Sequence, residues 1–198
     1  MTWVKVCGLT HPADVAAVVE SGGDAVGFVL IPSSPRFVTA DRAAELAADV
    51  PGHSVILTLD LEPEQALDVL GRTGTDGIQP YGDNASAVAR AASDAGHLVL
   101  YPLRATAGMT LAGLPGIPLL DTPSGSSLGG TGRTFDWALV EGLKEEFVLA
   151  GGLSPENVAD AVVQVRPWGV DVSSGLELAP GRKDHSMVAD FITKAKST

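Results

Sequence analysis

Two side chains of this chain stand where acid/base chemistry is possible, a thiol and a carboxyl group that each end a short apolar run. Cys7 ends the run 4–7, and Asp121 ends the run 118–121. A thiolate can act as base or nucleophile, whereas a carboxyl group that ends a buried strand is costly unless hydrogen-bonded or functional. Packing would also explain Cys7, and loop capping would explain Asp121. If they face each other, one can take a proton and the other give one, as an isomerase requires.

Arg36 and two glycine-rich turns could bind anions, and a third glycine-rich stretch lies in the longest loop. Pro35 stiffens the backbone before Arg36, whose fork of donors suits a carboxylate or a phosphate, although a surface ion pair would explain it as well. Glycines let backbone amides approach an anion closely, but they also simply permit tight turns. The turns after the last two apolar runs supply Gly151, Gly152, Ser173, Ser174 and Gly175 as candidate phosphate-binding residues. Gly129 and Gly130 lie in the longest loop, which is either a lid or a flexible connector.

Eight short apolar runs without polar alternation would position these residues. Such runs are typical of strands buried on both faces, as in a parallel sheet covered by helices. They comprise residues 4–7, 25–30, 55–59, 77–79, 98–101, 118–121, 147–150 and 169–172. Helix-like spacing lies between them or after the last, over residues 12–20, 40–49, 62–70, 84–95, 136–143, 155–165 and 185–196.

The alternation of strand and helix predicts an α/β fold, a single (β/α)8 TIM barrel whose active site lies at the carboxyl ends of the strands. An open doubly wound sheet is the competing fold, but no Gly-x-Gly-x-x-Gly follows the first run. Three glycines and Pro115 occupy residues 106–116, so we expect the fifth helix to be reduced or absent. That loss would account for a length slightly under the roughly 200 residues of small barrels. No linker divides residues 1–198, and the sequence predicts one domain.

Composition and charge exclude several classes of protein. Hydrophobic residues make up 45% of the chain, which excludes a disordered protein, and no apolar stretch approaches the length of a membrane span. A formal net charge of −11 repels nucleic acid and anionic lipid, so an anionic substrate must be attracted locally. The single cysteine forms no internal disulfide, and the histidines, in helix-start or loop contexts, lack metal-ligand spacing. We expect a cytoplasmic protein without metal, nucleic-acid partner or membrane attachment.

Taken together and in order, the motifs resemble the phosphoribosylanthranilate isomerase family of tryptophan biosynthesis. The chain opens with the pattern Lys-x-Cys-Gly-x-Thr at residues 5–10. The matching segments are residues 4–10, 27–30 with 34–38, 120–122 with 129–137, 149–158, 169–177 and 180–184. Their joint occurrence is far more specific than any one glycine motif.

The resemblance implies a cofactor-free Amadori rearrangement of N-(5-phosphoribosyl)anthranilate to 1-(2-carboxyphenylamino)-1-deoxyribulose 5-phosphate. By motif, Asp121 would be the general acid that opens the ribose ring, and Cys7 the general base that removes the C2′ proton. Arg36 would bind the anthranilate carboxylate. The turns of residues 150–153 and 172–175 would hold the phosphate, and the family's pattern places Asp171 among the substrate-binding residues. The loop with Gly129 and Gly130 would close over a small phosphorylated substrate, and either a monomer or a homodimer is compatible with the sequence.

The chain departs from the family pattern in one segment, and two alternative functions are to be compared with this one. Gln79-Pro80-Tyr81-Gly82 stands where the family usually has Gln-Leu-His-Gly, so we expect a different loop shape after the fourth strand. A sister isomerase of histidine biosynthesis resembles a twofold-repeated barrel with an aspartate at the position of Cys7. A non-catalytic phosphate-binding protein of the same fold would not need both a candidate base and a candidate acid.

Overall fold

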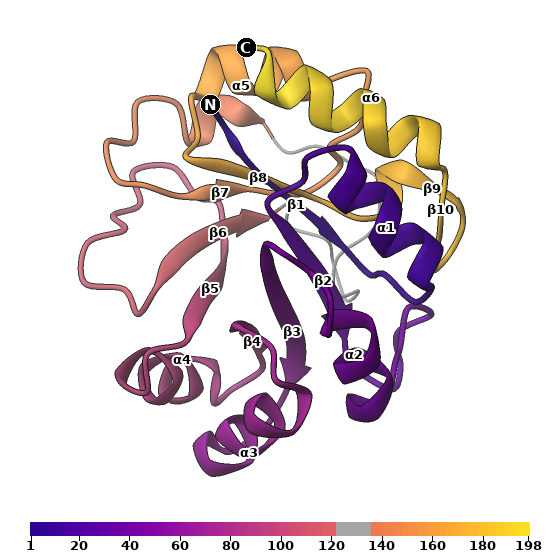
Figure 1. Cartoon of the computed structure of the whole chain (residues 1–198). Coiled ribbons are helices and arrows are strands. Elements are labelled where there is room, and N and C mark those ends of the chain that lie inside the picture. The colour runs from indigo at the N-terminus through magenta and orange to yellow at the C-terminus, as the bar shows by residue number, and fades with distance from the viewer. Residues whose placement is uncertain (122–135) are drawn as a thin grey trace.

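The computed structural model describes residues 1–121 and 136–198, and within them eight parallel strands close into a barrel (Figure 1). The strands are β1 (Trp3–Cys7), β2 (Ala25–Val29), β3 (His53–Leu59), β4 (Gly77–Tyr81), β5 (Leu98–Arg104), β6 (Ile117–Asp121), β7 (Val148–Leu149) and β8 (Gly169–Val172). The barrel closes where β1 pairs with β8, with Lys5 in register with Asp171. The (β/α)8 barrel predicted from the sequence is therefore confirmed.

Helices cover the outside of this barrel in Figure 1. They are α1 (Pro12–Glu20), α2 (Ala40–Ala47), α3 (Pro63–Thr73), α4 (Ala85–Asp94), α5 (Val158–Val165) and α6 (His185–Lys196). Local sequence explains their ends: α3 begins with a capping box between Glu62 and Gln65 and stops at the left-handed Gly74, and Asp184 caps α6. No helix of the described residues is long and apolar enough to cross a membrane.

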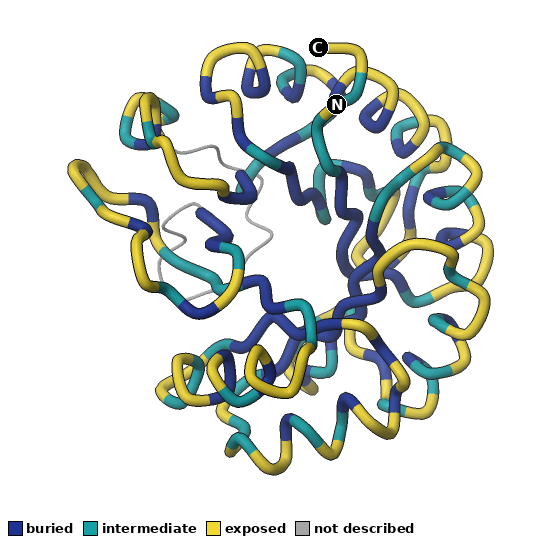
Figure 2. Tube along the Cα trace, turned by 60° about the vertical axis from the view of Figure 1, so that its left-hand side comes forward, coloured by how far each residue is buried: buried dark blue, intermediate teal, exposed yellow. Residues whose placement is uncertain are grey.

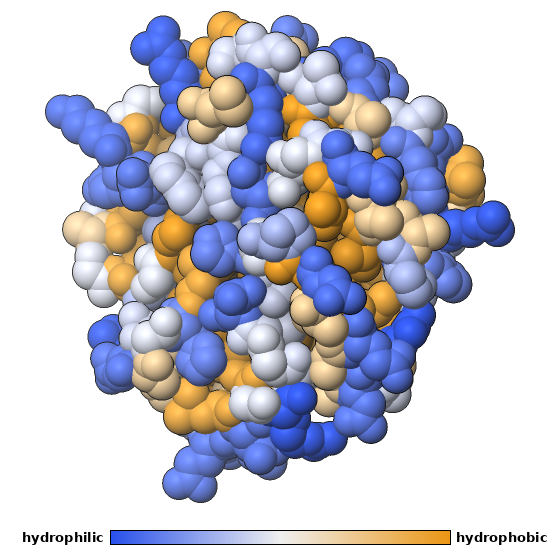
Figure 3. Space-filling model, in the orientation of Figure 1, coloured by the Kyte–Doolittle hydropathy of each residue, from blue (hydrophilic) through white to orange (hydrophobic). Residues whose placement is uncertain are grey.

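The core has an outer and an inner part, which is why the strand sequences are apolar throughout. The outer part fills the space between strands and helices, and the strands are buried along most of their length in Figure 2. Inside the barrel, Val55, Leu100 and Leu119 pack with Trp3 and Trp168, whose rings stack with centroids 5.0 Å apart. On the surface in Figure 3, charged and polar side chains project while apolar ones lie lower between them.

Alternation along β1 divides the barrel interior into levels. Trp3, Lys5 and Cys7 point inward because successive strand residues face opposite sides. Trp3 belongs to the apolar level just described, and Cys7 packs with Val29, Ile31 and Leu57 near the other end of the strands. Lys5 therefore marks a polar level between two apolar ones, directly beneath Cys7.

The helical layer is interrupted on the side of β5 and β6. Residues 105–116 form no helix, as expected, because Gly108, Gly113 and Gly116 adopt positive φ angles. The helix predicted over residues 136–143 is wrong: only a single 3-10 turn, η1 (Trp137–Leu139), forms before Gly142 at φ 83° ends it. Among the described residues, two connections therefore lack an α-helix, the one after β5 and the one before β7, whereas the sequence predicted only the first.

A small hairpin that the sequence analysis did not predict follows β8. A 3-10 turn, η2 (Ser174–Leu176), leads into β9 (Glu177–Ala179), which pairs with β10 (Arg182–Lys183) in antiparallel fashion. The Pro180-Gly181 turn joins the two strands, and the Thr10 hydroxyl donates to the Gly181 carbonyl at 2.7 Å. This contact fixes the hairpin beside the loop that follows β1.

Candidate active site

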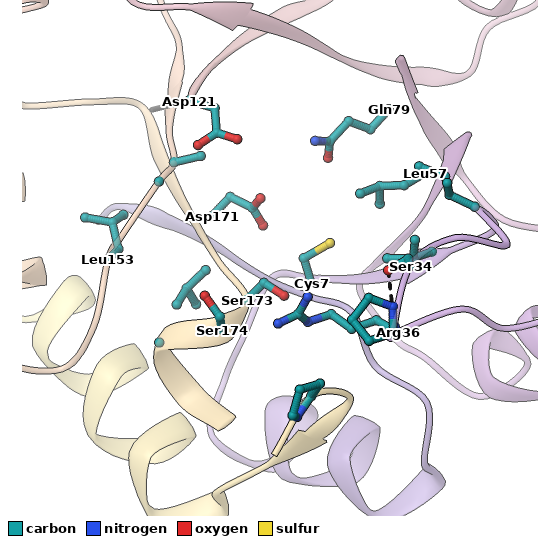
Figure 4. A pocket seen from close by; sticks show the side chains of 18 of the residues that line it. Cys7, Ser34, Arg36, Leu57, Gln79, Asp121, Leu153, Asp171, Ser173 and Ser174 are labelled. Atoms are coloured by element: carbon teal, nitrogen blue, oxygen red, sulfur yellow. Dashed lines mark hydrogen bonds between the residues drawn. The ribbon is translucent and has the colours of Figure 1, made fainter. Parts of the chain in front are cut away.

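A cavity of about 570 Å³ opens at the carboxyl ends of the strands and collects most of the residues expected to act there. Its lining includes Cys7, Ser34, Arg36, Gln79, Tyr81, Asp121, Gly151, Gly152, Asp171, Ser173, Ser174 and Gly175 (Figure 4). Two other strand-end residues, Asp60 and Arg104, are not among its lining residues. Gly129 and Gly130 lie outside the described residues. The sequence therefore located the cavity correctly, and the role of each residue in it remains a prediction.

The thiol of Cys7 lies inside this cavity and is almost inaccessible to solvent. The neighbouring strand makes room for it: a Cβ atom on Gly27 would lie 2.8 Å from the sulfur. Burial raises the pKa of the Cys7 thiol, and the Lys5 ammonium group opposes that rise. The thiol is thus kept protonated in the resting site, and the buried ammonium groups of Lys5 and Lys183 both favour a thiolate when it forms.

Beneath Cys7 lies a buried polar group that we call the inner cluster, made of Lys5, Gln79 and Asp171. The Lys5 ammonium donates to Asp171 Oδ1 at 2.8 Å and to Gln79 Oε1 at 3.1 Å, and its side chain is 0% exposed. Burial alone would lower the pKa of Lys5, but the Asp171 carboxylate outweighs it and the pKa is raised. Burial raises the pKa of Asp171, which Lys5 partly offsets. A lysine in the barrel interior is tolerated because both partners are fixed on barrel strands, Asp171 on the adjacent β8 and Gln79 on β4.

The inner cluster also orients Tyr81, the residue that departs from the family pattern. An ammonium group can only donate, so the Gln79 oxygen faces Lys5 and its amide group donates to the Tyr81 oxygen at 2.6 Å. The Tyr81 oxygen therefore accepts the hydrogen bond from Gln79, and the hydroxyl proton of Tyr81 is not used in that bond. Burial raises the pKa of Tyr81 well above its usual value, and Asp121 adds to the rise. Tyr81 is therefore a protonated donor beside Asp121.

The expected acid, Asp121, ends β6 and lines the same cavity as Cys7. Figure 4 shows both side chains directed into the cavity from different strands, with Asp171 between them. Pro80 shapes this end of the barrel: β4 pairs with β5 only up to Ile78, and proline offers no amide hydrogen to extend that ladder. Tyr81 ends β4 and lines the cavity.

Arg36 belongs to a second charged group at the rim of the cavity, the rim cluster, made of Arg36, Glu177 and Lys183. Arg36 donates from Nε and Nη2 to the two carboxylate oxygens of Glu177, at 2.8 and 2.7 Å. Lys183 donates to Glu177 Oε1 at 2.8 Å and to the Ser173 carbonyl at 2.9 Å, and its side chain is 0% exposed. Arg36 therefore both forms an ion pair and lines the cavity, so the two interpretations of the sequence are compatible.

The two glycine-rich turns meet at the side of the cavity next to Ser173 and Ser174. Gly151 and Gly152 adopt positive φ angles of 87° and 66°, and Asn157 holds the turn by donating to the Gly152 carbonyl at 3.0 Å. The turns touch at Gly175, where any side chain would collide with the Leu153 carbonyl oxygen. This packing brings backbone amide groups from two strand ends together, as an anion site requires.

Four functional candidates were not identified as such from the sequence. Lys5 was counted within an apolar run, although a lysine inside such a run is itself a signal of a buried partner. Glu177 and Lys183 lie in the unpredicted hairpin, and the turn residues Pro180-Gly181 between them were the available signal. Tyr81 was noted only as a departure from the family pattern.

The fold and the cavity define a (β/α)8-barrel enzyme with a candidate acid and base at the strand ends and two candidate anion sites. The family described as N-(5'phosphoribosyl)anthranilate (PRA) isomerase matches residues 4–194, and the chain belongs to this family. A protein of Geobacter sp. named N-(5'-phosphoribosyl)anthranilate isomerase is 41% identical, covering 99% of this chain and 98% of its own length. A protein of Halobacterium salinarum with the same name is also 41% identical, over 100% and 97%. The family predicted from the sequence is confirmed.

Solved structures agree with this assignment. The phosphoribosylanthranilate isomerase of Thermotoga maritima superposes with a TM-score of 0.90 at 36% identity, over 100% of both chains. A structure of such an isomerase in complex with reduced 1-(o-carboxyphenylamino)-1-deoxyribulose 5-phosphate gives a TM-score of 0.86 at 35% identity, also over 100% of both chains. Another Thermotoga maritima structure is described as monomers generated from a dimeric isomerase, with a TM-score of 0.87 at 35% identity and full coverage of both chains.

Proposed function

We propose that this chain converts N-(5-phosphoribosyl)anthranilate to 1-(2-carboxyphenylamino)-1-deoxyribulose 5-phosphate, a step of tryptophan biosynthesis. The observation that supports it most directly is the meeting of Cys7 and Asp121 in one cavity with the two anion sites. The substrate has a carboxylate and a phosphate at opposite ends of a sugar. The cavity offers Arg36 for one and the turns around Gly151 and Gly175 for the other, while the net charge of −11 gives no general attraction.

In the first step, Asp121 donates a proton to the ring oxygen of the ribose. The lone pair of the anilinic nitrogen forms a double bond to C1′ as the bond between C1′ and the ring oxygen breaks, which yields an open-chain Schiff base. Tyr81 remains protonated beside Asp121 and can donate a hydrogen bond to the oxygen that is released or to the new carboxylate. The result is an acidified C2′ proton next to the iminium group.

In the second step, Cys7, after its thiol proton has passed to solvent, removes the proton from C2′ as the thiolate. The electron pair moves into the C1′–C2′ bond and neutralises the iminium nitrogen, and the resulting enol tautomerises to the ketone. Burial disfavours the thiolate, so Cys7 is a strong base once its thiolate has formed. Lys5, the cation of the inner cluster, compensates the negative charge of the thiolate. Both steps transfer protons between the substrate and the side chains of Asp121 and Cys7, with no net gain or loss of electrons, so the chemistry as proposed needs no cofactor.

A direct assay tests this proposal. Purified protein in buffer with EDTA is mixed with freshly prepared phosphoribosylanthranilate, and the loss of the substrate's anthranilate fluorescence is followed. We expect turnover without added metal or cofactor, together with growth of a tryptophan auxotroph that lacks this step when it expresses the chain. Absence of turnover and of growth with a folded protein would refute the function.

The organisation of the protein completes the proposal. We propose that residues 1–198 act as one domain, since the residues that line the cavity come from β1, β2, β3, β4, β6 and β8. We propose also that the protein functions in the cytoplasm. Cys7, Arg36, Asp121 and the turns around Gly151 and Gly175 line the cavity of a single chain. A monomer would therefore hold every group that the two proton transfers use, and a homodimer would hold two such sites.

A further inference from the structure

The ion pair between Arg36 and Glu177 uses only part of the guanidinium group. Nε and Nη2 donate to the carboxylate of Glu177, which leaves Nη1 and the second hydrogen of Nη2 on the opposite edge. The Arg36 side chain is 14% exposed and lines the cavity, whereas the Glu177 side chain is 5% exposed and is not part of the lining. The edge that Glu177 does not use is therefore available to a substrate carboxylate.

The aliphatic part of Arg36 is held as closely as its head. A Cβ atom on Gly8 would lie 2.5 Å from Arg36 Cδ and 2.9 Å from Ser173 Oγ, so the arginine stem passes directly over this glycine. At its base, the Arg36 amide donates to the Ser34 hydroxyl at 3.1 Å, as the dashed line in Figure 4 shows. Arg36 thus has contacts at its backbone amide, along its aliphatic side chain and at its guanidinium group, and together they fix the position of that group.

A carboxylate beside an anion-binding arginine would normally weaken the site, because it cancels the positive charge. Lys183 removes this difficulty in the rim cluster: two cations meet one carboxylate, so the cluster carries a net charge of +1. Burial alone would raise the pKa of Glu177, but hydrogen bonds from Arg36 and Lys183 outweigh it and lower the pKa. Glu177 is therefore ionised at neutral pH, and the cluster still attracts an anion.

We propose that Glu177, with its charge compensated by the buried Lys183, is a positioning residue that holds Arg36 in the orientation required to bind the substrate's carboxylate. This inference rests on the proposed function, in which Arg36 is the ligand of that carboxylate. It assigns the β9–β10 hairpin a role in substrate binding, since Glu177 opens β9 and Lys183 ends β10. A preorganised arginine loses less conformational freedom on binding, so the benefit appears in affinity for carboxylated substrates.

The test is a comparison of two substrates in the variant Glu177→Gln. The amide keeps the shape of the side chain, but its NH2 group faces a donor and can no longer hold both nitrogens of Arg36. For phosphoribosylanthranilate we expect KM to rise at least tenfold while kcat stays within threefold. For the phosphoribosyl adduct of aniline, which lacks the carboxylate, we expect kcat/KM of the variant to stay within threefold of the wild type.

Controls separate this role from simple damage. Glu45→Gln removes a carboxylate from an exposed pair with Arg42, neither of which lines the cavity, and we expect no change with either substrate. Glu177→Asp keeps the charge on a shorter side chain, and we expect an intermediate KM; it also serves if Glu177→Gln does not fold. Equal losses of kcat/KM with both substrates, or an unchanged KM for phosphoribosylanthranilate, would overturn the inference.

Failure of the proposed function would look different. If the wild-type protein turns over neither substrate, the function is wrong. If the wild type turns over both with equal kcat/KM, the carboxylate is not recognised by Arg36, and the positioning role of Glu177 is overturned with it. Only a wild type that prefers the carboxylated substrate, combined with a variant that loses this preference, supports the inference.

Discussion

The inner and rim clusters each pair a buried lysine with a carboxylate, but they differ in net charge and in the segments that supply their residues. In the inner cluster, Lys5 and Asp171 are neighbours in register on β1 and β8, and their charges cancel. In the rim cluster, Lys183 and Arg36 share Glu177, all three come from loop or hairpin segments, and one positive charge remains. The inner cluster is therefore suited to a fixed electrostatic environment for proton transfer, and the rim cluster to the attraction of an anion.

This difference leads to a kinetic distinction. Groups that contact or support Cys7 and Asp121 should change kcat, because they act only as protons move. Groups that support Arg36 should change KM, because they act on a part of the substrate that does not react. A variant near Cys7 or Asp121 that changes only KM, or a variant near Arg36 that changes only kcat, would contradict this distinction.

The largest expected effect comes from removing the reacting groups themselves. We expect Cys7→Ser and Asp121→Asn each to lower kcat by about 10²–10⁴-fold, the usual contribution of a positioned acid or base, with KM changed only a few-fold. Both replacements are close in size to the native residue, so packing in the barrel is preserved. Steady-state kinetics by fluorescence measures both constants. Unchanged kcat in both variants would remove these roles from the mechanism.

Breaking the inner cluster should affect stability as well as turnover. Lys5→Met leaves Asp171 buried without its cation, and such a change costs about 3–5 kcal/mol in the free energy of unfolding. The double variant Lys5→Met/Asp171→Asn removes both charges and should recover most of that loss. Denaturant unfolding at pH 7 measures the difference. Equal stability of the single and double variants would show that the two charges are not coupled.

A smaller effect is expected from Tyr81→Phe, which removes only the hydroxyl that Gln79 orients. A single hydrogen bond contributes about 1 kcal/mol, so kcat should fall about 2–10-fold with KM nearly unchanged. Tyr101→Phe is the matched control, since Tyr101 packs against the outer core and is not among the cavity lining residues. A loss confined to KM would place Tyr81 with the binding groups instead.

The sequence was sufficient to predict the barrel and the meeting of Cys7 and Asp121 in one cavity, because both depend on local patterns. Cys7 and Asp121 end apolar runs, and parallel strands bring their carboxyl ends together in a barrel, so the two residues were expected to meet. The absent helix at residues 106–116 was likewise visible in its glycines. Local sequence determined these features, and no tertiary contact overrode it.

The charged clusters could not be predicted, because each depends on residues far apart in the chain. Lys5 and Asp171 are separated by 166 positions, and Arg36 and Glu177 by 141. The apolar run around Lys5 is a signal that the lysine has a buried partner, but nothing near it in the sequence indicates which residue that partner is. The helix predicted over residues 136–143 failed for a local reason instead, since Gly142 adopts a left-handed conformation that ends the turn.

The pKa of Cys7 can be measured in the resting enzyme without substrate. Cys7 is the only cysteine, so alkylation by iodoacetamide as a function of pH reports its thiolate alone. Burial raises the pKa of Cys7 and Lys5 opposes that rise, so the midpoint should lie above that of free cysteine and move higher still in Lys5→Met. Lys194→Met, which removes an exposed lysine of α6, should leave it unchanged. A midpoint that does not respond to Lys5 would separate the inner cluster from the base and leave Lys5 only a role in stability.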